Sequence, residues 1–165
     1  MRILGIDPGF ERLGVAVLER TASARGYGAP KKEQVIFSEC FKTFSKLDFA
    51  ERLGLIGQEV RKIIKKYKPE VLAIETLFLN TNHKTVMRVA EARGVVIYEA
   101  VQAGIKIFEA TPLQVKMATT GFGRADKIQM MKMVKILVDI DNSKKSDDEL
   151  DAIAVALTAF AHRRE

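Results

Sequence analysis

The sequence predicts a mixed α/β fold, in which one five-stranded sheet is flanked by helices. Three strand patterns occupy residues 2–41 without a helix between them, and from residue 49 onward helical and strand patterns alternate. A meander of this kind is antiparallel, whereas strands joined through helices are parallel. We therefore expect three antiparallel strands followed by parallel strands.

The strands are expected where apolar residues alternate with polar ones or run without interruption. Pro8-Gly9 should form the turn between the first two strands, and residues 21–33 have the glycine, proline and lysine content of an exposed loop. The run at 71–75 is typical of a central strand that is covered on both faces. The five expected strands are residues 2–7, 13–18, 34–41, 71–75 and 105–110.

The helices are expected where apolar residues recur at spacings of three and four. The first should begin near Phe49 and end before Lys68-Pro69, because the residue before a proline disfavours helix. Thr111-Pro112 has the chemistry of an N-cap and first turn. The remaining helices are expected at residues 85–101, over a segment that carries Ile128 to Leu137, and from about 146 to 163.

The composition indicates one domain over residues 1–165 of an intracellular protein. The apolar fraction is 47% of 165 residues, which suits one core. No signal-peptide pattern precedes the first strand, and no apolar run is long enough to span a membrane. The single cysteine, Cys40, fits a reducing cytosol and is interpreted as a small core residue. We therefore expect a cytoplasmic protein without membrane association.

The net charge of +6 indicates attraction to polyanions, of which nucleic acid is the natural candidate. This indication is weak by itself, because many basic proteins bind no nucleic acid. The choice between an enzyme and a simple binding module depends on the acidic residues.

Two carboxylates end strands that should be neighbours. Asp7 ends the first strand and Glu75 ends the fourth. Ligand sites of open α/β sheets lie beyond the carboxyl ends of strands, where the strand order reverses. Carboxylates that meet there repel one another unless a cation or a shared proton relieves them. The pair therefore indicates divalent metal binding.

Asp148 and Asp151 lie three residues apart and so share one face of the last helix. With Asp7 and Glu75 they make four carboxylates, which suit two Mg²⁺ ions. Each residue also has a structural interpretation. Acids in a first helical turn interact favourably with the helix dipole, Ser146 with Glu149 matches a capping box, Asp7 precedes a turn, and Glu75 could be a surface acid. Only the joint arrangement favours a site.

Several motifs resemble the bacterial Holliday junction resolvases of the RuvC family, and the similarity covers nearly the whole chain. Their order along the sequence makes chance agreement very unlikely. The motifs are Gly5-Ile6-Asp7-Pro8-Gly9, Ala73-Ile74-Glu75 with Phe78, Glu91-Ala92-Arg93-Gly94-Val95, Gln114-Val115-Lys116, Gly121-Phe122-Gly123-Arg124-Ala125-Asp126-Lys127, and Asp148-Glu149-Leu150-Asp151-Ala152-Ile153-Ala154.

The resemblance implies a ribonuclease H-like fold and an endonuclease that cuts four-way DNA junctions. It implies that the catalytic and metal-binding residues are Asp7, Glu75, Asp148 and Asp151. It further implies that Lys116 and Lys127 support contact with the DNA backbone, that the protein is a homodimer, and that a branch-migration helicase complex of the RuvA and RuvB type is its partner. Residues 21–33 look longer than is usual in the family, and some members carry His at the position of Asp148.

The four carboxylates lead to the hypothesis of two-metal hydrolysis. One Mg²⁺ would activate water for in-line attack, and the other would stabilise the departing 3′-oxygen. The products would carry 5′-phosphate and 3′-hydroxyl ends, and Mn²⁺ could replace Mg²⁺.

Four further residues are candidates for DNA contact. Phe78 opens a polar segment and could stack on an unpaired base, although a core or dimer-contact phenylalanine is the alternative. Arg124 and Lys127 follow Gly121 and Gly123, so that their loop could approach phosphates closely. A solvated helical face is the alternative for these two residues and for Lys116.

The helix at 85–101 is the candidate dimer interface, although its apolar residues could equally pack on the sheet. These residues are Val86, Val89, Ala90, Gly94 and Ile97. Two rival enzyme classes remain, together with a non-catalytic DNA-binding module. They are a related nuclease that acts on RNA or an RNA–DNA hybrid, and a phosphate-binding ATPase of the actin and sugar-kinase superfamily, for which this chain is too short.

Overall fold

The computed structural model describes residues 1–20, 33–77, 83–138, 140 and 145–163, without the side chains of residues 83 and 84. The expected loop at 21–33 therefore lies outside the described residues, except for Glu33. That residue is the first of a strand, and so does not belong to a loop. The elements are β1 Arg2–Asp7, β2 Arg12–Arg20, β3 Glu33–Lys42, α1 Phe49–Tyr67, β4 Val71–Glu75, α2 His83–Gln102, β5 Lys106–Ala110, α3 Pro112–Thr120, α4 Lys127–Leu137 and α5 Asp147–His162.

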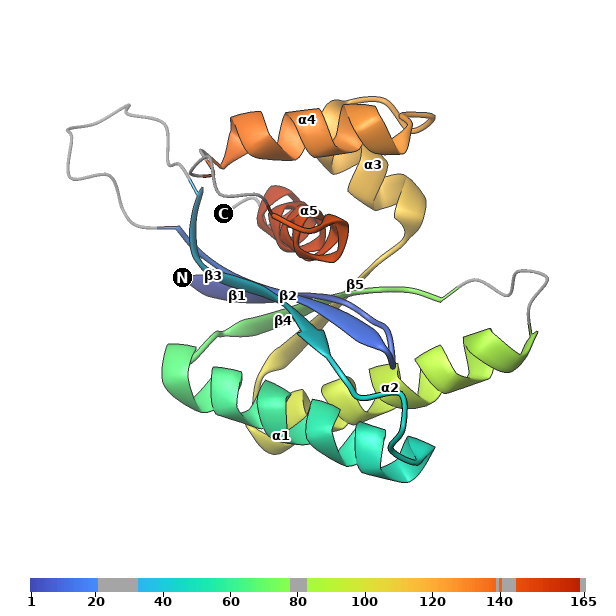
Figure 1. The fold of residues 1–165 in the computed structure, drawn as a ribbon. Coiled ribbons are helices and arrows are strands. Elements are labelled where there is room, and N and C mark those ends of the chain that lie inside the picture. Colours follow the sequence, from blue (N-terminus) through green and yellow to red (C-terminus); the bar gives the residue numbers. More distant parts are fainter. Residues whose placement is uncertain (21–32, 78–82, 139, 141–144, 164–165) are drawn as a thin grey trace.

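The sheet has the mixed topology that the sequence predicts. Its strand order is β3-β2-β1-β4-β5, in which β1 and β2 pair antiparallel and β1 and β4 pair parallel. The order therefore reverses at β1 and β4, as expected. Helices α1 and α2 cover one face of the sheet, and α5 lies on the other face beneath α3 and α4 (Figure 1).

The helix ends follow the expected capping chemistry. Lys68, in the left-handed conformation with φ of 49°, ends α1 directly before Pro69. Thr111 and Ser146 cap α3 and α5, each in a reciprocal capping box with the residue three positions later. The capping interpretation of Ser146 and Glu149 is therefore confirmed. None of the helices in the described ranges combines the length and the apolar character needed to cross a membrane.

The strands bury alternate residues on opposite faces of the sheet. On β1 the side chain of Ile3 packs in the cluster around α5, whereas Leu4 and Ile6 pack in the cluster beneath α1 and α2. Ten residues of α5 are buried, among them Leu150, Ile153 and Phe160. Because α5 has apolar neighbours on nearly every side, the backbone of its N-terminal turns is held in a fixed position relative to the sheet.

Gly5 lets α5 approach β1 closely. A methyl group at this position would lie 2.2 Å from the carbonyl oxygen of Ala152 and 2.8 Å from the Cβ of Ala156. A side chain would force the helix away from the sheet, since a backbone oxygen cannot rotate aside. The glycine thus sets the depth at which α5 lies on the sheet.

We predict that Gly5→Ala destabilises the fold by about 1–3 kcal/mol, the usual cost of overpacking a core. Gly54→Ala is the matched control, because a methyl group on this exposed face of α1 meets nothing within 4 Å. The control should gain stability, by up to roughly 1 kcal/mol, from its higher helix propensity. Urea denaturation of the two variants measures both effects. Equal stabilities would contradict the close approach of α5 to β1.

Candidate active site

The carboxylates of Asp7 and Glu75 lie at the ends of adjacent parallel strands. Ile6 is paired with Ile74 in the register of β1 and β4, so that each acid follows a paired isoleucine. Gly14 stands opposite Asp7 on β2. A methyl group at Gly14 would lie 2.1 Å from the carbonyl oxygen of Asp148 and 3.0 Å from the Cβ of Asp7. The first turn of α5 therefore lies directly beside Asp7.

Burial and the neighbouring negative charges disfavour ionisation of the acidic side chains. Burial and the charges of Asp151, Glu75 and Asp148 raise the pKa of Asp7 to about 7. Burial and the charge of Asp151 also raise the pKa of Glu75, and burial raises the pKa of Asp151. Because these four residues come from three separate elements, the fold itself concentrates the negative charge.

Lys127 partly neutralises this charge. Its ammonium lies 3.3 Å from the carboxylate of Asp147 and 3.5 Å from that of Asp151. Burial lowers the pKa of Lys127, but the two carboxylates outweigh it and the net shift is upward. The structure thus places Lys127, which was predicted to contact DNA, among the carboxylates.

Arg12 and Cys40 hold the carboxylate of Asp148. The Arg12 guanidinium lies 2.6 Å from Asp148 Oδ2, and the Cys40 thiol donates to the same oxygen at 3.3 Å. Cys40 is only half-buried, so its interpretation as a core residue is wrong. It points to the edge of the site because β3 carries it beside Gly14.

Arg93 supports Glu75 through the backbone. Its Nε donates to the carbonyl oxygen of Glu75 at 3.0 Å, and its guanidinium also pairs with Glu109 on β5. Sequence reasoning assigned no role to Arg93 or Arg12. The motif Glu91-Ala92-Arg93-Gly94-Val95 could have drawn attention to Arg93. Nothing in the sequence indicates the contact between Arg12 and Asp148, because these residues lie 136 positions apart.

A cavity of about 240 Å³ lies beside the carboxylates, lined by Glu75, Asp151, Lys116 and Lys127 among others. Lys116, at the cavity wall, lowers the pKa of Glu75 against the larger opposing effect of burial. Arg124 is exposed between α3 and α4 and forms no ion pair within the described ranges. Phe78 lies outside the described residues.

The chemistry of the acidic set fits a divalent metal, because hard carboxylate oxygens and mutual repulsion both favour a bound cation. As the side chains are oriented, no three His, Cys, Asp or Glu side chains of the described residues form a closed ligand group. Arg12 and Lys127 hold Asp148 and Asp151 instead. A bound cation would have to displace these contacts or share the carboxylates with them.

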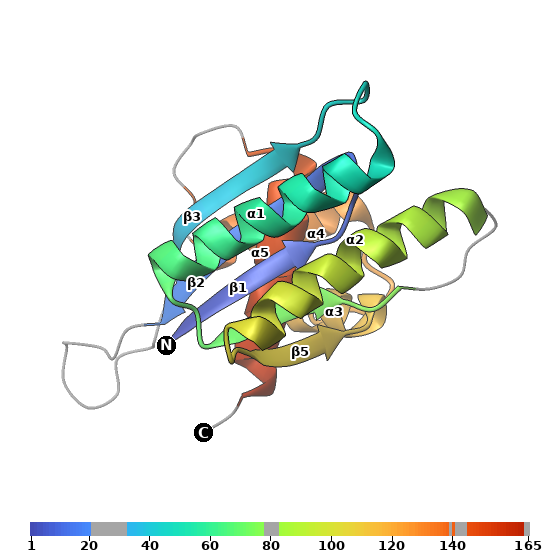
Figure 2. The same ribbon diagram turned by 90° about the horizontal axis from the view of Figure 1, so that it is seen from below.

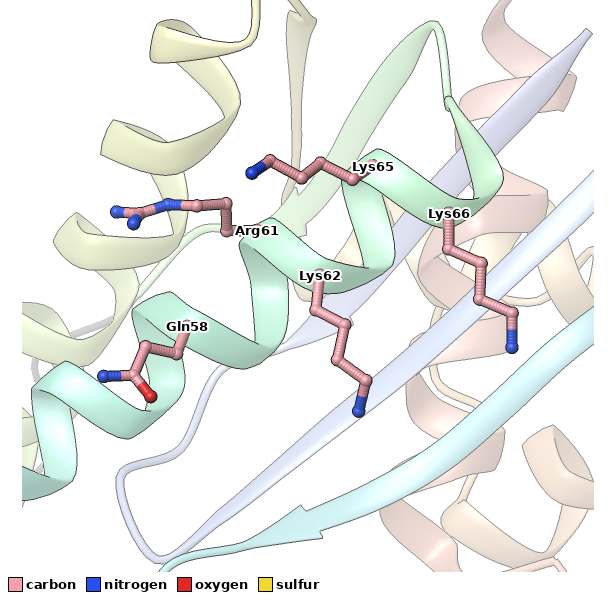
Figure 3. Close-up of a pocket in the computed structure, with 5 residues that line it drawn as sticks. All are labelled: Gln58, Arg61, Lys62, Lys65 and Lys66. Carbon is pink, nitrogen blue, oxygen red and sulfur yellow. The ribbon is translucent and has the colours of Figure 1, made fainter.

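A second charged region lies on α1. Gln58, Arg61, Lys62, Lys65 and Lys66 project from this helix around a hollow of about 460 Å³ (Figure 3). Two of these cations are already paired, Arg61 with the buried Glu99 at 2.6 Å and Lys62 with Glu59 at 3.1 Å. Two of the four positive charges around this hollow are therefore neutralised by carboxylates of the protein itself.

Solved structures of known proteins share this fold. A Thermus thermophilus RuvC structure has a TM-score of 0.86 and 32% sequence identity, covering 99% of this chain and 96% of that one. The structure of T. thermophilus RuvC in complex with Holliday junction substrate has a TM-score of 0.87 and 30% identity, covering 99% and 95%. The sheet order and these two matches define the class as a ribonuclease H-like fold.

Sequence comparison identifies the family. The family model described as crossover junction endodeoxyribonuclease RuvC matches residues 3–159. The crossover junction endodeoxyribonuclease RuvC of Caldanaerobacter subterraneus is 45% identical over 157 residues, 95% of this chain and 90% of that protein. The protein of the same name from Halothermothrix orenii is 42% identical over the same shares. This chain belongs to the RuvC family.

The raised pKa of Asp7 makes stability depend on pH in the metal-free protein. The unfolded chain releases this proton near pH 3.8, whereas the folded chain keeps it until about pH 7. Stability should therefore fall as pH rises through this window and remain reduced above it.

We predict that Asp7→Asn stabilises the metal-free protein at pH 8 by roughly 2–4 kcal/mol, and changes its stability little at pH 4. Urea denaturation in chelator at the two pH values provides the measurement, with the lower pH as internal control. A variant that is less stable than the parent at pH 8 would show that Asp7 is not under electrostatic strain.

Proposed function

We propose that this chain is a structure-selective endonuclease that resolves four-way (Holliday) DNA junctions during recombination and repair. The observation that carries the proposal is the family match over residues 3–159, since that range includes all four carboxylates. A related T. thermophilus RuvC has been solved with a Holliday junction substrate. The hydrolysis would be paired and would leave 5′-phosphate and 3′-hydroxyl ends.

We further propose Mg²⁺ as the cofactor, with two ions per site and Mn²⁺ as a substitute. Asp7, Glu75, Asp148 and Asp151 would hold them, which accords with the electrostatic coupling of Asp7 to the other three acids. When bound, magnesium supplies Lewis-acid chemistry that activates water and stabilises the leaving oxygen.

The side chains around the acids have separate roles in this proposal. Asp7 must lose its proton to bind a cation, and the contacts of Lys127 with Asp147 and Asp151 limit the repulsion that results. Lys116, which lines the cavity beside Glu75, would hold a substrate phosphate near the acids. Arg12 and Cys40 fix the rotamer of Asp148 through its Oδ2 oxygen.

Asp7→Asn and Asp151→Asn should each lower junction cleavage by more than roughly 100-fold, because even outer-shell partners of a metal cost 10–100-fold. Junction binding should persist, since phosphate contacts come from other residues. The assay uses a labelled four-way junction with magnesium or with chelator, beside a matched linear duplex and an RNA–DNA hybrid.

Near-normal cleavage by a folded Asp7→Asn protein would refute the metal assignment. Degradation of the hybrid with no cutting of the junction would favour the RNA-directed nuclease instead. A junction that is bound by the parent protein but never cut would identify a DNA-binding module, and the acids would then have only structural roles.

We propose that the protein acts as a homodimer through α2. Three large apolar side chains of this helix are exposed, namely Met87 at 62%, Tyr98 at 57% and Val101 at 57%. Ala90 and Gly94 are exposed between them, so that spacings of three and four form one apolar stripe. Of the predicted interface residues, Val86, Val89 and Ile97 are half-buried. A two-fold dimer would suit the two-fold symmetry of a four-way junction.

Gly94→Glu should convert the dimer to a monomer and separate the paired cuts into independent nicks. A side chain at Gly94 meets nothing within 4 Å, so that the monomer should fold normally. Gly54→Glu introduces the same charge at an equally open position on α1 and is the matched control. Light scattering after size-exclusion chromatography gives the mass. A dimeric Gly94→Glu protein would exclude this surface.

Three further expectations remain predictions. Phe78 would stack on an unpaired base at the branch point, and Arg124 would contact the DNA backbone from the loop after α3. A branch-migration helicase complex of the RuvA and RuvB type would deliver the junction. They are supported by the family resemblance of the quoted motifs and, for Arg124, by its exposure.

A further inference from the structure

Two arginines and two phenylalanines form a cluster beside the turn that follows β1. The rings of Phe10 and Phe49 meet edge to face, with centroids 5.7 Å apart. The guanidinium carbon of Arg52 lies 4.9 Å from the centre of the Phe10 ring. That of Arg88 lies 5.6 Å from the Phe10 ring and 5.2 Å from the Phe49 ring. One aromatic pair therefore carries two cations.

Arg52 has a structural task in this cluster. It is only 5% exposed, and its Nε donates to the hydroxyl of Thr43 at 2.8 Å, which in turn donates to the carbonyl oxygen of Phe10 at 2.6 Å. These contacts fix the turn that follows Asp7. One terminal nitrogen of Arg52 still lacks a hydrogen-bond partner among the described residues, and Glu11 approaches it only to 3.8 Å.

Arg88 has no comparable internal partner. It is exposed on α2, and no carboxylate in the described part of the chain forms an ion pair with it. The rings of Phe10 and Phe49 hold the guanidinium of Arg88 in place by cation–π contact, which uses none of its N–H groups as hydrogen-bond donors to an acceptor oxygen. This planar fork matches the oxygens of a phosphate. Because Arg52 and Arg88 both lie against the Phe10 ring, their positive charges repel each other. An external anion bound to Arg88 would relieve this repulsion.

The cluster lies at the same end of the sheet as the carboxylates. Phe10 follows Asp7 by three residues, and Arg93, five residues after Arg88 on α2, donates to the carbonyl oxygen of Glu75. The N-terminal ends of α1 and α2 both lie toward the end of the sheet to which the β1 arrow points (Figure 2). Lys116 and Lys127 border the acids on the other face, from α3 and α4.

We propose that Arg88, held by Phe10 and Phe49, binds a backbone phosphate of the nucleic acid on the α1–α2 side of the acidic site. The cluster is then a phosphate contact separate from Lys116, Arg124 and Lys127, and the nucleic acid crosses the end of the sheet from one face to the other. The inference rests on the proposed function, because it identifies a further contact with the same substrate.

The test compares Arg88→Gln with Lys65→Gln, each of which removes one exposed positive charge. Lys65 lies near the C-terminal end of α1, away from the cluster, and is the matched control. All proteins also carry Asp7→Asn, so that a labelled four-way junction is bound without being cut. Fluorescence anisotropy over a series of KCl concentrations gives the slope of log affinity against log salt.

Loss of one phosphate contact should lower the magnitude of this slope by about 0.9, the value for one phosphate on duplex DNA. We expect that loss for Arg88→Gln, together with weaker binding at low salt, and an unchanged slope for Lys65→Gln. A slope for Arg88→Gln equal to that of the parent protein would overturn the proposal. An equal decrease in slope for both variants would also overturn it, because it would indicate a general effect of net charge.

The result that would refute the proposed function differs from the result that would refute the phosphate contact. A chain with Asp7 intact that never cuts the junction with magnesium refutes the nuclease and leaves the phosphate contact to be judged from the slopes. If no protein binds the junction at any salt concentration, both the function and the contact are overturned.

Discussion

The close approach of α5 to the first two strands is the constraint on which the site depends. Gly5 and Gly14 leave no side chain between the strands and the backbone of α5, at Ala152 and Asp148 respectively. The helix is then locked by apolar contacts along nearly its whole length. Because α5 cannot slide or lift, its acidic first turns must lie against Asp7 whatever their electrostatic cost.

That cost is considerable, and it reveals how the protein balances stability against function. Because the pKa of Asp7 rises to about 7, ionisation of this carboxyl near neutral pH lowers the stability of the folded chain. Lys127 and Arg12 compensate in part, through ion pairs with acids of α5. Such strain is common where chemistry needs an arrangement that stability alone would not select. A bound cation would be a more complete form of compensation than either side chain.

The basic side chains on the two faces of the sheet have different kinds of partners. On the α3–α4 face, Lys116 and Lys127 lie beside the acids and are partly engaged with them. On the α1–α2 face, Arg88 lies against aromatic rings instead, and no carboxylate among the described residues pairs with it. By contrast, Arg61 on α1 is bound to a buried glutamate and serves the packing of α1 on α2. Exposed charge alone therefore does not distinguish cations available to a ligand from cations already in use.

The sequence by itself determined the mixed sheet, the order of its elements, the caps at Thr111 and Ser146, and the placing of Asp7 and Glu75 at neighbouring strand ends. These features follow from local periodicity and from the rules that connect strands through helices. Only the tertiary structure decided that Arg12 and Cys40 hold Asp148, that Lys127 joins the acids, and that Arg88 lies on the rings of Phe10 and Phe49. Side chains far apart in the chain meet at distances set by helix–sheet packing, and no spacing within the sequence encodes those distances.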